Sequence, residues 1–144
     1  MRSLSTRPER PGQGTAPGRV RIVGGAWKRT PIAVVDRAGL RPTPDRVRET
    51  LFNWLSFLRP DTAALRGLDL FAGTGVLGFE LASRGARSVL LVERDPDLIE
   101  RLEALKARLD ARQIEIVAGD AMSIAARLAP VSRSYRPHVH TIRN

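Results

Sequence analysis

A glycine-rich segment at residues 69–78 constrains the fold of this chain more than any other feature. It reads Asp-Leu-Phe-Ala-Gly-Thr-Gly-Val-Leu-Gly and places glycines at 73, 75 and 78 in a Gly-x-Gly-x-x-Gly pattern. An apolar strand pattern precedes it and a helix pattern follows, the setting in which such glycines form a tight turn beneath a bound ligand. Glycine is needed there because a side chain would block close approach of a ligand to the backbone.

Strands and helices alternate from residue 66 onward, which indicates an α/β fold with a parallel sheet. The second strand is an almost continuous apolar run, as expected when helices cover both faces. Asp95 is predicted to cap the next helix, Pro96 to open it, and Gly85 to end the preceding one. The expected strands are 68–71, 88–92 and 114–117, and the expected helices are 74–83, 96–109 and 121–128.

Two short β-branched stretches before this region predict a hairpin. Residues 19–23 and 31–35 flank a loop that begins with two glycines and carries Trp27, Lys28 and Arg29. Such spacing is typical of two antiparallel strands. A tryptophan in a basic loop can stack on a base or pack in the core, and the sequence leaves both open.

A helix is predicted over residues 43–58. Thr43 is placed to act as its N-cap, and Pro44 would occupy the first helical position. Apolar residues recur at helical spacing and are expected to form one buried face, with Trp54 in the core rather than on a base-stacking surface. The residues of this expected face are Val47, Leu51, Trp54, Leu55 and Leu58.

Charge is distributed unevenly along the chain. Residues 1–66 hold 13 lysines and arginines against 5 acidic residues, whereas residues 67–130 hold 8 against 10 and residues 131–144 hold 3 against none. A basic segment beside a near-neutral α/β region suits a polyanionic partner such as nucleic acid. Solvated surface charge in an arginine-rich protein explains the same excess, so charge alone leaves both interpretations open.

The composition excludes several kinds of site. Because the chain has no cysteine, it forms no disulfide, thiolate zinc site or cysteine nucleophile. No apolar run approaches the roughly 18 residues of a membrane span, and the N-terminus lacks the apolar core of a secretory signal. His138 and His140 have no third ligand in view, so no metal is expected. We expect a cytoplasmic monomer with no membrane partner.

These patterns divide the chain into four parts. Residues 1–18 are rich in Pro, Gly, Ser and Arg and are expected to be disordered. Residues 19–60 form the hairpin and helix, and residues 61–130 form the first half of a cofactor-binding Rossmann-like domain. Residues 131–144 are a polar, basic tail in which we expect no strand. With three strands only, the first would present an unpaired edge.

Three acidic residues near the glycine segment indicate which cofactor it suits. Glu93 follows the first glycine by 20 residues and ends the next strand, where a carboxylate accepts hydrogen bonds from ribose hydroxyls. Asp69 lies inside the first strand, and its charge suits the cationic groups of S-adenosylmethionine better than the pyrophosphate of the alternative, a nicotinamide dinucleotide. Asp120 follows the third strand, placed to accept from an adenine amino group, to cap the next helix, or both.

Five blocks of this sequence resemble the RsmD family, bacterial methyltransferases that modify N2 of a guanine in 16S ribosomal RNA. The resemblance covers about residues 19–128. It implies an S-adenosylmethionine-dependent methyltransferase (Rossmann-like) fold, here incomplete, with a small N-terminal hairpin and helix extension. The blocks are RIVGG at 21–25, WK at 27–28, LRPT at 40–43, DRVRETLFNWL at 45–55 and DLFAGTGVLG at 69–78.

The resemblance also implies roles for individual residues. Gly73, Gly75, Glu93 and Asp120 would contact the cofactor. The basic hairpin and the 41–48 block would hold 16S rRNA, in the small ribosomal subunit or its assembly intermediate. Phosphate contacts of this kind position RNA without reading its sequence, although Arg46 and Arg48 could instead pair with Asp45 or Glu49. The candidate cofactor-binding residues are Asp69, Phe71, Gly73, Gly75, Glu93 and Asp120, and the candidate RNA-binding residues are Lys28, Arg29, Arg41, Arg46 and Arg48.

The chain departs from the family at its catalytic motif. The resemblance implies Asp/Asn-Pro-Pro-Tyr/Phe after a fourth strand, a motif that holds the target amine and stacks on the flipped base. The sequence contains no such motif, and Tyr135 and Pro137 do not reproduce it. We therefore assign no catalytic residue and expect a truncated or frame-shifted product without methyl transfer. Two alternatives stay open: a non-catalytic RNA-binding remnant, and a relative of adenine-N6 DNA methyltransferases.

Overall fold

A four-stranded parallel sheet forms the centre of the molecule. The structure, a computed structural model, describes residues 18–35, 40–128 and 139–141. Its main sheet contains β3 (Arg66–Asp69), β4 (Ser88–Glu93), β5 (Ile114–Ala118) and β6 (Val139–Thr141). These strands lie in the order β5-β4-β3-β6, and each neighbouring pair is parallel.

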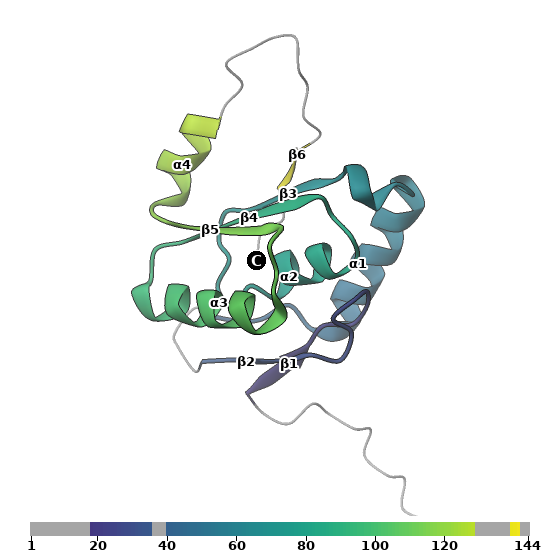
Figure 1. Ribbon diagram of the computed structural model, residues 1–144, viewed down its shortest axis with the longest axis horizontal. Helices are drawn as coiled ribbons and strands as arrows, with labels where there is room; N and C mark the ends of the chain where they lie inside the picture. Colours follow the sequence, from purple (N-terminus) through teal and green to yellow (C-terminus); the bar gives the residue numbers. More distant parts are fainter. Residues whose placement is uncertain (1–17, 36–39, 129–138, 142–144) are drawn as a thin grey trace, which may run out of the picture.

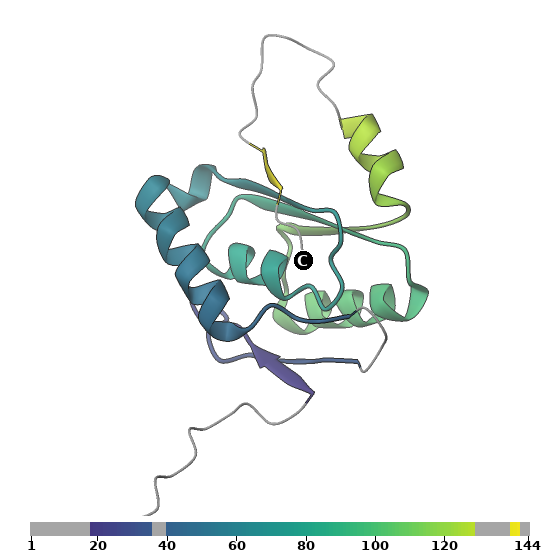
Figure 2. The same ribbon diagram turned by 180° about the vertical axis from the view of Figure 1, so that it is seen from behind.

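Helices connect the strands and cover the sheet. They are α1 (Asp45–Leu58), α2 (Val76–Ser83), α3 (Pro96–Leu109) and α4 (Ala121–Leu128), with a short 3-10 helix at Thr62–Ala64. Figures 1 and 2 show α2 and α3 side by side along one side of the sheet, with α1 next to α2. Because α2 joins β3 to β4 and α3 joins β4 to β5, the predicted alternation of strands and helices is confirmed.

The start of α3 follows its sequence signals. Asp95 is the N-cap, and its side chain accepts a hydrogen bond from the Asp97 N–H at 2.9 Å. Pro96 begins the helix, where its missing N–H costs nothing. Three leucines at helical spacing face the core and are buried: Leu98, Leu102 and Leu105.

The N-terminal hairpin packs on α2. Its strands, β1 (Arg19–Arg21) and β2 (Pro31–Ala33), are antiparallel and place Val20 opposite Ile32. Both of these side chains are buried in the same core as Phe79 of α2. The predicted hairpin is therefore confirmed, and one continuous core extends across the predicted boundary near residue 60.

The sequence predicts an unpaired edge on the first strand, and this prediction is wrong. Val139–Thr141, in the tail where we expect no strand, pairs in parallel with β3 and places His140 beside Gly67. β-branched residues favour extended backbone. Pairing also satisfies amide and carbonyl groups of β3 that would otherwise lack partners at this edge.

The buried face of α1 also differs from the predicted one. Its fully buried residues are Arg48 and Phe52, and Leu55 packs against the core. Trp54 is 69% exposed, so the prediction that it belongs to the core is wrong. The helix turns a different face toward α2 than predicted, for two reasons. The Phe52 ring packs beneath the Arg84 guanidinium, with 5.0 Å between Cζ and the ring centroid, and Arg48 pairs with the buried Glu80. The other four residues of the predicted face form an exposed surface, here called the α1 stripe, of Val47, Leu51, Trp54 and Leu58.

The first turn of α1 lacks the predicted cap. Pro44 occupies the N-cap position, not the first helical position, and no side chain caps the helix. The Thr43 carbonyl instead accepts a hydrogen bond from Arg48 Nε at 3.0 Å. The buried arginine therefore secures the chain entering the helix.

The sequence alone favours a monomer, but the exposed α1 stripe is expected to make the chain self-associate at high concentration. Replacing Leu51 and Leu58 together by glutamate is expected to reduce this self-association. These side chains are 39% and 70% exposed, and contiguous exposed apolar surface promotes association. Sedimentation velocity over a range of protein concentrations measures the effect. Asn53→Glu, exposed on another side of α1, is the matched control. Equal association of the double variant and this control would show that the α1 stripe is not the contact.

Some predictions concern residues without described structure. These are the disorder of residues 1–17 and the roles weighed for Tyr135, Pro137 and His138. Among the residues whose structure is described, no helix is long and apolar enough to cross a membrane. The same residues contain no group of three His, Asp or Glu side chains that could hold a metal ion.

Candidate cofactor site and the polar network behind it

The chain turns sharply from β3 into α2 at the glycine segment. Gly73 and Gly75 have φ angles of +54° and +78°, a left-handed conformation that glycine adopts without strain. The Gly75 N–H donates to the Ala72 carbonyl at 2.7 Å, and the Phe79 N–H donates to the Gly75 carbonyl at 2.9 Å. The loop therefore closes as a tight turn, and α2 begins immediately after it.

Packing inside the protein explains two of the three glycines. A Cβ on Gly75 would lie 2.4 Å from a methyl carbon of Leu102, and one on Gly78 would lie 2.2 Å from a methyl carbon of Leu91. These positions bring α2 against α3 and β4, the close helix–strand approach that the last glycine of such a pattern permits. Room for a ligand is therefore not needed to explain either residue.

Asp69 ends β3 and is almost completely buried, with 2% of its surface exposed. One carboxylate oxygen accepts a hydrogen bond from the Phe71 N–H at 3.3 Å. The other, Oδ2, is buried and accepts none from the described part of the chain. Burial raises the pKa of Asp69 to about 7, Glu93 adds to the rise, and the Phe71 hydrogen bond opposes it.

An unsatisfied buried carboxylate oxygen calls for a partner. A cationic group on a ligand would satisfy Asp69 Oδ2 and stabilise the charged form of the carboxylate. A pyrophosphate would bring two like charges together instead. The Asp69 carboxylate therefore fits the sulfonium and amino groups of S-adenosylmethionine.

Glu93, at the end of β4, is attached to the glycine loop. Its Oε2 accepts the Gly73 N–H at 2.9 Å, and its Oε1 accepts the N–H groups of Arg94 and Asp95 at 2.8 and 3.0 Å. Since a carboxylate offers about four acceptor positions, roughly one stays available. Glu93 can thus hold the loop in place and accept a hydrogen bond from a ribose hydroxyl.

Asp120 caps α4, one of the two roles that the sequence leaves open for it. Its Oδ2 accepts the Ser123 N–H at 2.9 Å and the Ser123 hydroxyl at 3.0 Å. These hydrogen bonds lower the pKa of Asp120, so it carries its charge at neutral pH. The carboxylate is exposed at the end of β5. The structure thus establishes the capping role, and contact with adenine stays a prediction.

A cavity of about 270 Å³ lies between β2 and α3. It reaches the glycine loop at Gly73 and Thr74, but none of the three acids lines it. Arg101 and Arg108 of α3 are its charged lining residues. The cavity is therefore separate from the acids that fit a cofactor, and we do not assign it to that role.

The candidate RNA-binding residues divide into exposed and buried ones. Lys28, Arg29, Arg41 and Arg46 are exposed. The Arg48 side chain has no exposed surface, so it cannot reach a phosphate and we remove it from the set. Trp27 is half-buried against Phe79, with ring centroids 6.3 Å apart, and this favours packing over stacking on a base.

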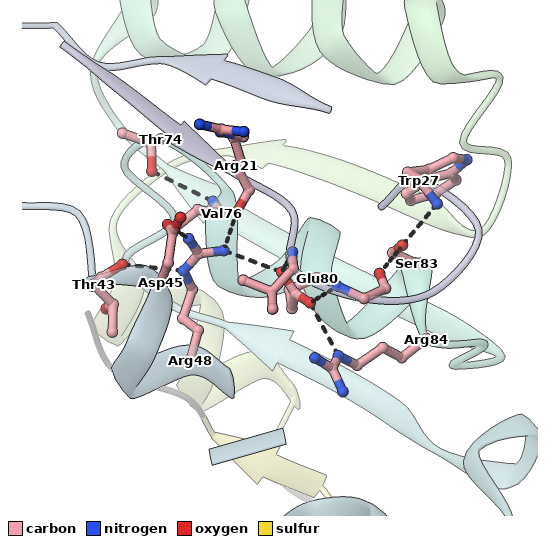
Figure 3. A network of polar contacts seen from close by, with 12 residues as sticks. Arg21, Trp27, Thr43, Asp45, Arg48, Thr74, Val76, Glu80, Ser83 and Arg84 are labelled. Carbon is pink, nitrogen blue, oxygen red and sulfur yellow. Dashed lines mark hydrogen bonds and ion pairs between the residues drawn. The ribbon is translucent and has the colours of Figure 1, made fainter. Parts of the chain in front are cut away.

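Sequence reasoning missed the buried acid that holds Arg48. Glu80 lies in the middle of α2 with no exposed surface. Its Oε2 accepts the Val23 N–H at 2.8 Å and Arg48 Nη1 at 3.0 Å, and its Oε1 accepts the Gly24 N–H at 2.8 Å and Arg84 Nε at 3.0 Å. Figure 3 shows these contacts converging on one carboxylate. The available signal was a lone charge inside an otherwise apolar helix.

Arg48 is the second centre of this network. Besides Glu80, its guanidinium donates to the Arg21 carbonyl at 2.7 Å and to the Thr43 carbonyl at 3.0 Å, and it pairs with Asp45. The sequence left open that Arg48 pairs with Asp45 on the helix surface, and the structure confirms Asp45 as a partner. The Arg48 end of this pair is buried and the Asp45 side chain stays partly exposed, because the network joins α1, α2 and the hairpin (Figure 3).

Comparison with known proteins places this geometry in a family. A family model described as "Conserved hypothetical protein 95" matches residues 20–136. The ribosomal RNA small subunit methyltransferase D of Escherichia coli K12 is 44% identical over 110 residues, which are 76% of this chain and 54% of that protein. The protein of the same name from Haemophilus influenzae is 47% identical over 88 residues, or 61% and 44% of the two chains. The chain thus spans about half the length of the curated relatives it matches.

Solved structures show the same fold. The putative methyltransferase yhhF from Escherichia coli has a TM-score of 0.66 and 41% identity, over 76% of this chain and 57% of that one. A hypothetical protein from Thermus thermophilus has a TM-score of 0.62 and 34% identity, over 75% and 60%. With the parallel sheet described above, these similarities confirm the predicted methyltransferase-type Rossmann-like fold in incomplete form.

Proposed function

Because the chain belongs to the family described as conserved hypothetical protein 95, we propose that it contains the cofactor-binding part of an S-adenosylmethionine-dependent methyltransferase. The proposed substrate of the complete activity is N2 of a guanine in 16S rRNA. The observation that carries the proposal is the buried Asp69 Oδ2 beside the glycine loop, which accepts no hydrogen bond from the residues that the structure describes. S-adenosylmethionine would supply a methyl group on a positively charged sulfur.

The acids around the loop have distinct proposed tasks. Asp69 would bind the cationic end of the cofactor, and Glu93 would accept from its ribose while it holds Gly73 in place. Asp120 would accept from the adenine amino group, next to its capping bond. The half-exposed Phe71 side chain follows Asp69 and would cover the bound cofactor. Proximity and orientation would dominate such a transfer.

The exposed cations form the proposed RNA-binding surface. Lys28 and Arg29 lie in the hairpin loop, whereas Arg41 and Arg46 lie before and within the first turn of α1. Phosphate contacts by these residues would make RNA affinity fall with salt. The proposed partner is 16S rRNA, in the small subunit or an assembly intermediate, and the proposed location is the cytoplasm.

The chain by itself is expected to bind S-adenosylmethionine without transferring its methyl group. The sequence lacks Asp/Asn-Pro-Pro-Tyr/Phe, so nothing would hold the target amine. Calorimetry measures cofactor binding. Incubation with labelled cofactor and undermodified small subunits measures transfer, and the Escherichia coli relative serves as positive control.

Two results would contradict this proposal. Methyl incorporation above background would show that the chain is active without the motif. Absence of cofactor binding, together with salt-dependent RNA binding, would instead support a non-catalytic RNA-binding remnant.

A further inference from the structure

We propose that Glu80 is a positioning residue that fixes the basic hairpin and α1 relative to the cofactor loop, and that RNA affinity therefore depends on it. This inference rests on the proposed RNA-binding function. Glu80 itself has no exposed surface and cannot touch RNA. It would act through the segments that its carboxylate holds.

Each carboxylate oxygen of Glu80 accepts one hydrogen bond from the hairpin turn and one from an arginine in another segment. Oε2 binds the Val23 amide and Arg48 of α1, and Oε1 binds the Gly24 amide and Arg84 at the end of α2. Bonds between ionised and backbone groups are stronger than neutral ones. One carboxylate thus determines where the hairpin loop and α1 lie on α2.

A second set of contacts docks the same turn on the end of α2. The Ser83 hydroxyl accepts the Trp27 N–H at 2.9 Å and donates to the Gly24 carbonyl at 2.6 Å. The Ala26 N–H donates to the Ser83 carbonyl at 2.8 Å. A Cβ on Gly25 would lie 1.9 Å from that carbonyl oxygen. The turn and the helix end are therefore in direct backbone contact.

The exposed cations lie next to these anchored residues in the sequence. Lys28 and Arg29 come immediately after Trp27, and Arg46 lies on α1 two residues before Arg48. Moreover, α2 begins at the glycine loop, one helical turn before Glu80. The proposed RNA surface and the proposed cofactor site therefore share one rigid support. Loosening Glu80 would let the cations move while the loop stays in place.

The test compares Glu80→Gln with Glu103→Gln, an exposed residue on α3. Both substitutions remove one negative charge, so simple electrostatics predicts slightly tighter RNA binding for each. If Glu80 positions the hairpin and α1, Glu80→Gln instead weakens RNA binding, and its affinity for transcribed 16S rRNA is expected to fall by about five- to tenfold. We expect S-adenosylmethionine affinity to change less than about threefold in both variants.

Amide hydrogen exchange provides a readout that does not need RNA. In Glu80→Gln the amides of Val23, Gly24 and Trp27 are expected to exchange at least about tenfold faster, whereas those of β4 keep their rates. Ser83→Ala, a milder change, is expected to act in the same direction and covers the case in which Glu80→Gln does not fold.

Several outcomes would overturn the inference. One is RNA affinity in Glu80→Gln that equals or exceeds that of Glu103→Gln. Another is equal acceleration of the hairpin and β4 amides in both Glu80→Gln and Ser83→Ala, since that shows only a global loss of stability. If the unaltered chain does not bind 16S rRNA, the proposed function fails, and the exchange rates alone then decide whether Glu80 positions the hairpin.

Discussion

Replacing Arg48 by methionine is expected to lower the free energy of unfolding by about 3 kcal/mol. The substitution keeps the apolar stem and removes the charge that faces Glu80, a residue with no exposed surface. It also removes donors from the Arg21 and Thr43 carbonyls. A buried ion that loses its partner costs several kcal/mol, and the remaining Arg84 contact limits the loss to the lower end of that range.

Chemical denaturation followed by circular dichroism measures this effect, with Arg46→Met as the matched control. Arg46 lies on the same helix but is exposed, so its loss is expected to change stability by less than about 0.5 kcal/mol. Changing Arg48 and Glu80 together to methionine is expected to recover part of the loss, since both charges then disappear. Equal stability of the two single variants would show that the buried pair contributes nothing.

Replacing Asp69 by asparagine is expected to increase stability at neutral and alkaline pH. The pKa of Asp69 is raised to about 7 in the folded chain, whereas an unfolded aspartate has its ordinary value near 3.9. The folded chain therefore binds the proton more tightly, and its stability falls as pH rises from about 4 to 7. Asparagine does not titrate, so it avoids this loss.

The stability gained by Asp69→Asn is expected to be about 2 kcal/mol larger at pH 8 than at pH 5. Denaturation of both proteins at the two pH values measures the difference. Glu115→Gln, exposed on β5, is the matched control for the loss of one carboxylate. A constant difference between Asp69→Asn and the unaltered chain would show that Asp69 titrates normally.

The same substitution is expected to weaken S-adenosylmethionine binding by at least about tenfold. The amide has no charge to offer the cationic end of the cofactor. Increased stability together with weaker binding is the behaviour of a functional group that the fold itself does not need. Unchanged cofactor affinity would place the cationic end away from Asp69.

Local sequence signals predicted the elements around the cofactor loop. Asp95 and Pro96 mark the start of α3, and the hairpin forms at its two β-branched stretches. The spacing of Glu93 from Gly73 also holds, since the two residues share a hydrogen bond. These features depend on neighbours in sequence or on one strand–turn–helix unit, so they can be read without the rest of the molecule.

Sequence-based predictions were wrong where a residue's contacts come from distant segments of the chain. They placed Trp54 in the core and Arg48 on RNA, whereas the structure exposes Trp54 and buries Arg48. Helical periodicity gives the faces of α1 but not which face meets α2. That choice depends on Glu80, 32 residues further along the chain. The strand at residues 139–141 likewise gains its stability from pairing with β3, which no local pattern reveals.

The sequence by itself therefore determined the strand–loop–helix unit, its acids and its resemblance to a family, because those depend on short-range geometry. Only the tertiary structure decided which charged residues are available to partners. Burial left one Asp69 oxygen without a hydrogen bond from any described residue, and long-range pairing gave Arg48 a structural partner. The physical reason is that desolvation and ion pairing act through space, between residues that folding brings together.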